Sequence, residues 1–149
     1  MQRPAIPFLI LGGVSVIAGG VLSAAAAPAP SYTASWAVAY IVLVAGVAQL
    51  VLGLGQAQLA SHQPPGRVVA AEAVAFNLAH VAVLLGTIIG AAWMVDIGAA
   101  LIVVALGLFI WSVRGASAGN RWMLYGFRVM ILIVLITTPI GVVIANLKA

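Results

Sequence analysis

The sequence predicts an all-α, polytopic integral membrane protein, a bundle of about five transmembrane helices with the N-terminus inside and the C-terminus outside. Of its 149 residues, 65% are hydrophobic and 5% are charged, which is too little polar surface to cover a soluble core of this size. The apolar residues also fall into runs of the length that crosses a bilayer, roughly 20 residues of helix. We therefore expect residues 1–149 to form a single transmembrane helical domain.

The first part of the chain predicts two spans, at about residues 6–27 and 35–60. No Asp, Glu, Lys or Arg occurs between Arg3 and Arg67, and a single helix of that length fits no bilayer. The turn between the spans is expected at residues 28–33, where two prolines interrupt the helix. An alternative is that Arg3, the first apolar run and the alanines at 25–27 form a cleavable signal peptide.

The second part predicts three spans, at about residues 68–94, 97–113 and 122–147. A polar loop with two prolines precedes the third span, and Asp96 and Gly98 interrupt the apolar run after it. The fourth span is the shortest and lies near the lower limit for crossing a bilayer. A basic loop, residues 114–121, separates it from the fifth span.

The placement of charge predicts the orientation. With the N-terminus inside, the inner side receives most of the cations: Arg3, Arg67, Arg114, Arg121 and Arg128. The outer side receives Asp96 and Lys148, so the distribution follows the positive-inside rule. Aromatic residues near the span ends are expected to mark the outer interface (Tyr32, Trp36, Trp93) and the inner one (Trp111, Trp122, Tyr125). We expect a multi-pass protein of the plasma membrane, and the abundance of Ala, Val, Gly and Leu suggests a bacterial inner membrane.

Small residues are expected to hold the helices together, because the hydrophobic effect does not drive association in lipid. Stripes on the first two spans should face each other: Gly12, Ser15, Gly19 and Ser23 on one, and Ala39, Gly46, Gln49, Gly53 and Gln56 on the other. A third stripe on the fifth span has Thr137, Gly141 and Ala145. Pro139 should kink that span, with Thr137 or Thr138 bonding the freed Leu135 carbonyl.

The third span is expected to be the central helix, because its side chains sort into distinct faces at 100° per residue. One face should meet lipid: Val74, Leu78, Val81, Leu85 and Ile88. A second face is small: Ala75, Ala79, Ala82, Gly86 and Gly90. The polar residues Asn77, His80 and Thr87 lie beside the small face and are expected to point toward neighbouring helices.

His80 is the candidate cofactor ligand. It lies about twelve residues into the third span, roughly 18 Å deep at 1.5 Å per residue, and so near the midplane. An imidazole there can ligate haem iron, bind a quinone or relay protons. Haem commonly needs a second axial ligand, and His62 is too distant to supply it. His80 of a second copy of the chain would have to provide that ligand. The alternative is a hydrogen bond to Gln49 or Thr138 that joins two helices. No metal site is predicted.

Four residues are candidates for a polar transport path: Gln49, Glu72, Asn77 and His80. Glu72 would admit a proton or cation to that path, or would instead pair with Arg67 or Arg128 near the membrane surface. Gln49, with Gln56, could line the path, contact a headgroup or quinone oxygen, or bond across a helix pair.

The arginines at the inner side are candidates for contact with anionic lipid headgroups. They are Arg114, Arg121 and Arg128. The alternative is that these charges only set the orientation of the chain.

The expected function is that of a structural or accessory subunit of a membrane complex, or of a homo-oligomer. The chain has no cysteine and only two carboxylates, and it contains no Walker, HExxH or GxSxG motif, so an enzyme acting alone is not expected. The alternatives are a small transporter or channel and a haem or quinone binder. Membrane lipids and other membrane subunits, or further copies of the chain, are the expected partners. Nucleic acid is not expected, because the cations lie at span ends.

Overall fold

The computed structural model describes residues 3–115 and 121–148, and every element in these ranges is helical. A short 3-10 turn, η1 (Arg3–Ala5), leads into α1 (Ile6–Ala26). The second span is continuous through α2 (Tyr32–Tyr40), η2 (Ile41–Ala48) and α3 (Gln49–Leu59). The others are α4 (Gly66–Ile89), α5 (Ala92–Ser112) and α6 (Arg121–Lys148). These give five helices long and apolar enough to cross a membrane, as the sequence predicted.

The boundary between the third and fourth spans was predicted wrongly. Gly90 has a φ of 72° and ends α4 in the left-handed conformation, which glycine adopts without a Cβ clash. The fourth span therefore starts at Ala92 and has 21 residues, so Asp96 lies inside α5 rather than between the spans. The hydropathy pattern did not reveal this turn, because the residues on both sides of Gly90 are apolar.

The second span also begins earlier than predicted, at Tyr32. The reason is the N-cap: the Ser31 side chain accepts a hydrogen bond of 3.1 Å from the Ala34 N–H. Within this span η2 is a π-helix, with wider turns than an α-helix. These turns shift the heptad register, so Gly46 and Gly53 are buried in the bundle whereas Ala39, seven residues before Gly46, is exposed.

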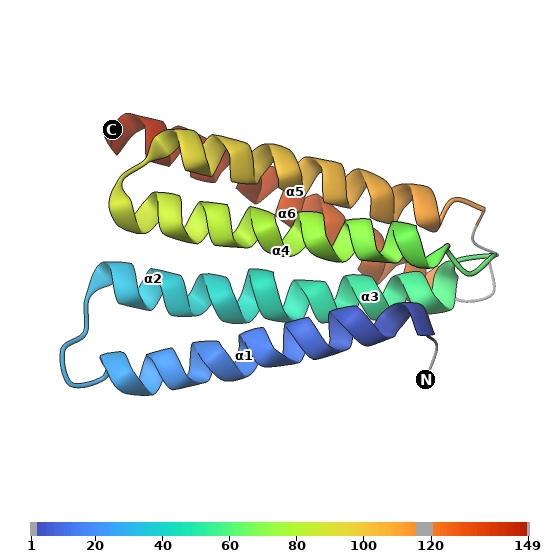
Figure 1. Ribbon diagram of the computed structural model, residues 1–149, viewed down its shortest axis with the longest axis horizontal. Helices are drawn as coiled ribbons and strands as arrows, with labels where there is room; N and C mark the ends of the chain where they lie inside the picture. Colours follow the sequence, from blue (N-terminus) through green and yellow to red (C-terminus); the bar gives the residue numbers. More distant parts are fainter. Residues whose placement is uncertain (1–2, 116–120, 149) are drawn as a thin grey trace.

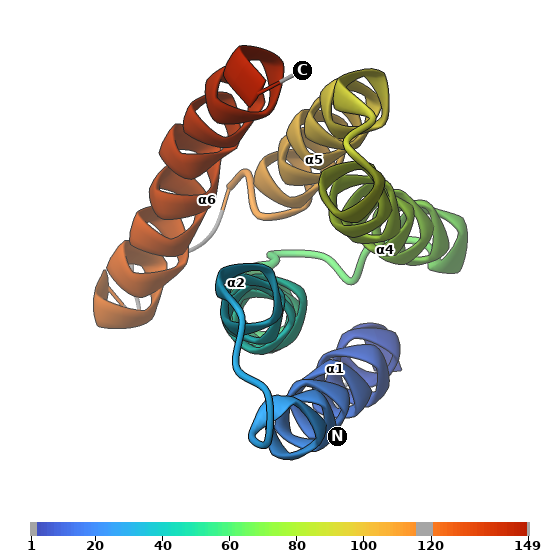
Figure 2. The same ribbon diagram turned by 90° about the vertical axis from the view of Figure 1, so that its left-hand side faces the viewer.

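The second span, rather than the third, occupies the middle of the bundle. In the end-on view of Figure 2, α1, α4, α5 and α6 surround it. α1 packs along its whole length, α6 packs against α3, and α4 packs mainly against α5. The predicted lipid-facing residues of α4 are exposed on the outer surface, as expected: Val74, Leu78, Val81, Leu85 and Ile88.

The predicted contact between the small faces of the first two spans is confirmed for its glycines. A Cβ on Gly12 would lie 2.9 Å from the Leu50 side chain, and one on Gly46 would lie 2.6 Å from that of Val16. Ser15 instead donates to the carbonyl of Leu11 in its own helix, and Ser23 is exposed. The two glycines of the GxxxG motif in α4 have different roles. Gly86 packs against Val95 of α5, whereas Gly90 forms the turn between α4 and α5.

The N-terminus and the C-terminus lie at opposite ends of the bundle (Figure 1). We call the end with the N-terminus the basic end, because Arg67 and Arg121 start α4 and α6 there and Arg114 follows α5. The other end, with Asp96, is the far end. The side chains of Arg3 and Lys148 lie outside the described part of the chain, so their predicted places are untested.

Helix α6 diverges from the second span toward the far end, as Figure 2 shows. It continues through Pro139 from Arg121 to Lys148. Thr137 and Thr138 donate to the carbonyls of Ile133 and Val134, at 2.8 Å and 2.7 Å, rather than to the predicted Leu135 carbonyl. Near its far end α6 is linked to α5 by a 3.0 Å hydrogen bond that Asn146 donates to Asp96.

Candidate functional site

Four polar side chains are buried among the described residues: Gln49, Gln56, Glu72 and His80. They come from the second span and α4, whose surfaces face each other in the bundle. Gln56 and Glu72 belong to one group toward the basic end and His80 belongs to another in the far half, whereas Gln49 joins neither. A buried polar group is costly unless it is hydrogen-bonded, so the partners of each group indicate its role.

Glu72 is the centre of the group toward the basic end. Its carboxylate is fully buried and accepts hydrogen bonds from Gln56 Nε2, at 2.7 Å and 2.6 Å to the two oxygens, and from Ser112 Oγ at 2.7 Å. These are its partners among the described residues, so the predicted pairing with Arg67 or Arg128 is wrong. Arginines near a membrane surface extend toward water, whereas Gln56 and Ser112 face the carboxylate from neighbouring helices.

Three fully buried phenylalanines form a layer beside this group: Phe8, Phe76 and Phe109. The ring centroids of Phe8 and Phe109 are 5.1 Å apart, and those of Phe76 and Phe109 are 6.1 Å apart. Phe76 and Phe109 each lie about one helical turn from Glu72 and Ser112, on the side of the far end. The phenylalanine layer therefore separates the Glu72 group from the far half.

His80 and Tyr40 form the second group, on the other side of this layer. The Tyr40 hydroxyl lies 2.9 Å from His80 Nδ1, and the Phe76 ring lies edge-on to the imidazole at 4.3 Å between centroids. His80 is 3% exposed, and its Nε2 has no hydrogen-bond partner in the described part of the chain. The partner is thus neither Gln49 nor Thr138. Tyr40 was missed, although a tyrosine this far inside an apolar span was a signal to look for a polar contact.

The four candidates for a transport path are not brought together. Asn77 donates to the Ala73 carbonyl of its own helix at 2.7 Å. Gln49 is fully buried, and both polar atoms of its amide have no hydrogen-bond partner among the described residues. Glu72 and His80 belong to different groups. Glu72 bonds Gln56, and His80 bonds Tyr40. Both partners belong to the second span, and neither is among the four candidates.

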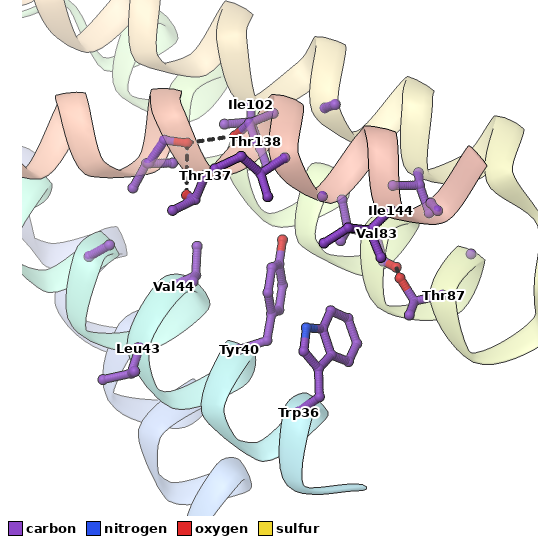
Figure 3. Close-up of a pocket in the computed structure, with 18 of the residues that line it drawn as sticks. Trp36, Tyr40, Leu43, Val44, Val83, Thr87, Ile102, Thr137, Thr138 and Ile144 are labelled. Carbon is purple, nitrogen blue, oxygen red and sulfur yellow. Dashed lines mark hydrogen bonds between the residues drawn. The ribbon is translucent and has the colours of Figure 1, made fainter. Parts of the chain in front are cut away.

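A cavity of about 660 Å³ lies in the far half, between the second span and the diverging part of α6, with α4 and α5 behind it. Figure 3 shows Tyr40 and Trp36 pointing into this space from α2. Their rings stack with centroids 5.3 Å apart. The rest of the wall is mostly apolar, and Thr87 and Thr138 contribute further hydroxyls. His80 is not part of the wall, but it lies directly behind Tyr40, to which it is hydrogen-bonded.

The cavity exists because small residues line it where α6 turns away. A Cβ on Gly141 of α6 would meet nothing within 4 Å, so this helix is not in close contact there. In the basic half the same helix is close-packed: a Cβ on Gly55 would lie 2.5 Å from the Phe127 ring. Hydropathy did not reveal this contrast, because apolar residues continue through both halves of α6.

Two of the three arginines predicted to contact headgroups line one smaller cavity at the basic end. This cavity has a volume of about 220 Å³ and lies between α5 and α6. Arg114 and Arg128 are part of its wall, and Arg121 is not. The Arg114 guanidinium also lies 4.4 Å from the centre of the Trp111 ring.

Comparisons of this chain with protein-family models, with curated proteins and with solved structures found no match.

Proposed function

We propose that this protein binds a lipophilic molecule with a hydrogen-bonding ring, of the prenylated quinone and quinol class, in the 660 Å³ cavity. The observation that carries the proposal is Tyr40, which lines this mostly apolar space while its hydroxyl is bonded to His80. Ligand sites typically have volumes of about 300–1,000 Å³ and combine apolar walls with a few placed polar groups. A quinone reaches such a site from the surrounding lipid.

The Tyr40–His80 pair suits both redox forms of a quinone. If His80 Nδ1 carries its proton and donates to Tyr40, the tyrosine O–H is free to donate to a quinone carbonyl. If Nδ1 is the acceptor, the tyrosine oxygen can accept from a quinol hydroxyl. The stacked Trp36 ring supplies an aromatic surface beside the same position.

Haem is less well supported at this position. His80 does not line the cavity, its Nδ1 faces Tyr40, and its ring is packed against Phe76. Iron would need an imidazole nitrogen directed into open space. Transport is also a weaker alternative, because the phenylalanine layer lies between Glu72 and His80.

Binding of a short-chain quinone to the protein in nanodiscs tests the proposal, with quenching of tryptophan fluorescence as the readout. The Tyr40→Phe variant should bind about tenfold more weakly, which corresponds to the loss of one hydrogen bond of roughly 1.4 kcal/mol. Tyr125→Phe is the matched control, since Tyr125 is exposed at the basic end. Equal affinity of Tyr40→Phe and wild type, or no saturable quenching, would refute the proposal.

A second candidate is a role as an accessory subunit or homo-oligomer, and the exposure of α6 favours it. In the most apolar stretch of α6 17% of the residues are buried, the same share as in α1, against 39% in each of the other three spans. Helices that pack in a membrane bury such faces against other helices. Size determination in mild detergent tests this role: a monomer without co-purifying subunits would argue against it.

We also propose that the basic end faces the cytoplasm of a bacterial cell, which places the N-terminus inside and the C-terminus outside. The chain contains no cysteine, so single cysteines can report the side directly. Ser61→Cys, at the basic end, should react with a membrane-impermeant maleimide only after lysis. Ala29→Cys, in the loop at the opposite end, should react in intact cells, and the reverse pattern would invert the orientation.

A further inference from the structure

The smaller cavity at the basic end combines two cations with an apolar wall. Arg114 follows the end of α5, and Arg128 is seven residues into α6, roughly 10 Å along that helix at 1.5 Å per residue. The two side chains nevertheless line the same 220 Å³ space. The rest of its wall is mainly apolar: Ile110, Val113, Leu124, Phe127 and Ile131.

Neither arginine has a countercharge within the described part of the chain. Their side chains have no hydrogen-bond or ion-pair partner there. The sequence has only two acidic residues, and both are engaged elsewhere: Glu72 bonds Gln56 and Ser112, and Asp96 bonds Asn146 at the far end. An anion for these guanidinium groups must therefore come from outside the chain.

The position of Arg114 is restrained before any ligand binds. Its guanidinium lies over the Trp111 ring, a cation–π contact that limits where the side chain can point. Gly115, with a φ of 80°, turns the chain directly after it. Arg128 approaches the same space from a helix that carries the apolar residues Leu124 and Ile131 one turn away on each side. The cavity is thus cationic and bordered by surfaces that suit acyl chains.

We propose that this cavity binds the phosphodiester of one anionic phospholipid, with Arg114 and Arg128 on its oxygens and the acyl chains along Leu124 and Ile131. Guanidinium groups match phosphate geometry with paired hydrogen bonds, which an ammonium cannot reproduce. Basic pockets between helices at the cytoplasmic side are suited to anionic lipid headgroups. The proposal is independent of quinone binding, since the two cavities share no residue.

Native mass spectrometry of the full chain tests the proposal, after delipidation and addition of equal phosphatidylglycerol and phosphatidylcholine. The wild type should retain one phosphatidylglycerol preferentially. Arg114→Gln/Arg128→Gln should lose this preference by about tenfold or more, as expected when paired guanidinium contacts to phosphate are removed. Arg67→Gln/Arg121→Gln is the matched control: it removes the same charge from the same end, leaves the cavity intact and should retain the lipid.

Two further arms separate the alternatives. Arg114→Lys/Arg128→Lys keeps the charge, so a loss of retention in this variant supports guanidinium recognition, and circular dichroism shows whether each variant is folded. Inorganic phosphate at millimolar concentration should not displace the lipid, because it lacks acyl chains. Equal losses in the Arg67/Arg121 control, unchanged retention in Arg114→Gln/Arg128→Gln, or displacement by inorganic phosphate would overturn the proposal.

Discussion

The buried polar groups have different surroundings in the basic half and in the far half of this bundle. Near the basic end, Glu72 is enclosed by Gln56 and Ser112, and the phenylalanine layer covers them. In the far half, the Tyr40–His80 pair borders a cavity of about 660 Å³. The Glu72 carboxylate finds its partners on neighbouring helices, which stabilises helix contacts even though Gln56 Oε1 has no hydrogen-bond partner among the described residues. The Tyr40 side chain, by contrast, borders a cavity in which it can meet a ligand.

Close packing accounts for the difference between the halves. In the basic half, a Cβ on Gly53 would collide with Phe8, so α1 and the second span have no spare room. In the far half, a Cβ on Gly141 of α6 would meet nothing within 4 Å, whereas α4 and α5 stay close-packed there, with a Cβ on Gly86 2.8 Å from that of Met94. Substitutions of equal size should therefore have unequal effects beside the phenylalanine layer and beside the diverging part of α6. Two comparisons test this packing, and two further predictions test the buried polar groups.

The largest effect is expected for Phe76→Ala, which removes one member of the phenylalanine layer. Loss of a buried phenylalanine costs about 3–5 kcal/mol in soluble proteins, and we expect up to this range here because the ring contacts both Phe109 and His80. Ile144→Ala is the control in the far half, where the side chain lines the cavity and is 47% exposed. Unfolding by sodium dodecyl sulfate in mixed micelles, followed by circular dichroism, measures both. Equal losses would remove the distinction between the halves.

A smaller effect is expected from adding one methyl group. Gly53→Ala should destabilise the protein by about 1–3 kcal/mol, because the new Cβ overlaps Phe8 and forces α1 away from the second span. Gly141→Ala should leave stability unchanged or raise it slightly, since the space is open and alanine favours helix. The same unfolding measurement applies, and a destabilised Gly141→Ala would show that α6 packs more closely than described.

Glu72→Ala should cost roughly 2 kcal/mol, at about 0.6 kcal/mol for each interhelical hydrogen bond lost to Gln56 and Ser112. Asn77→Ala is the control on the same helix. Its amide bonds the Ala73 carbonyl of its own helix, so its loss should cost less than about 0.5 kcal/mol. A larger effect at Asn77 than at Glu72 would contradict the assignment of Glu72 as the structural centre of the basic half.

Among the four main substitutions, apart from their controls, Tyr40→Phe is expected to have the smallest effect on stability. It removes one hydrogen bond, to His80, and should cost about 0.6 kcal/mol while keeping the ring stacked on Trp36. Thermal unfolding in nanodiscs measures this loss. A cost above that of Glu72→Ala would mean that Tyr40 and His80 serve the fold as the Glu72 group does.

Individual residues show how far sequence reasoning reached. The sequence analysis singled out the four polar residues that are buried: Gln49, Gln56, Glu72 and His80. It did not predict their hydrogen-bond partners, because these depend on which helices meet and on where along the bundle axis each side chain lies. The π-helix shifted the register of the second span, and an apolar turn at Gly90 was invisible to hydropathy. Arginine was expected beside Glu72 on grounds of charge, but Gln56 and Ser112 occupy that place.

Sequence alone predicted five helices long and apolar enough to cross a membrane, because long apolar runs with charges at their ends satisfy their backbone hydrogen bonds within each helix. It also determined that glycines join the first two spans, because only small residues permit close backbone approach. Tertiary structure decided that the second span is central, that phenylalanines close one half, and that α6 leaves a cavity beside Tyr40 in the other. These features arise from contacts between residues far apart in the chain, which local periodicity does not record.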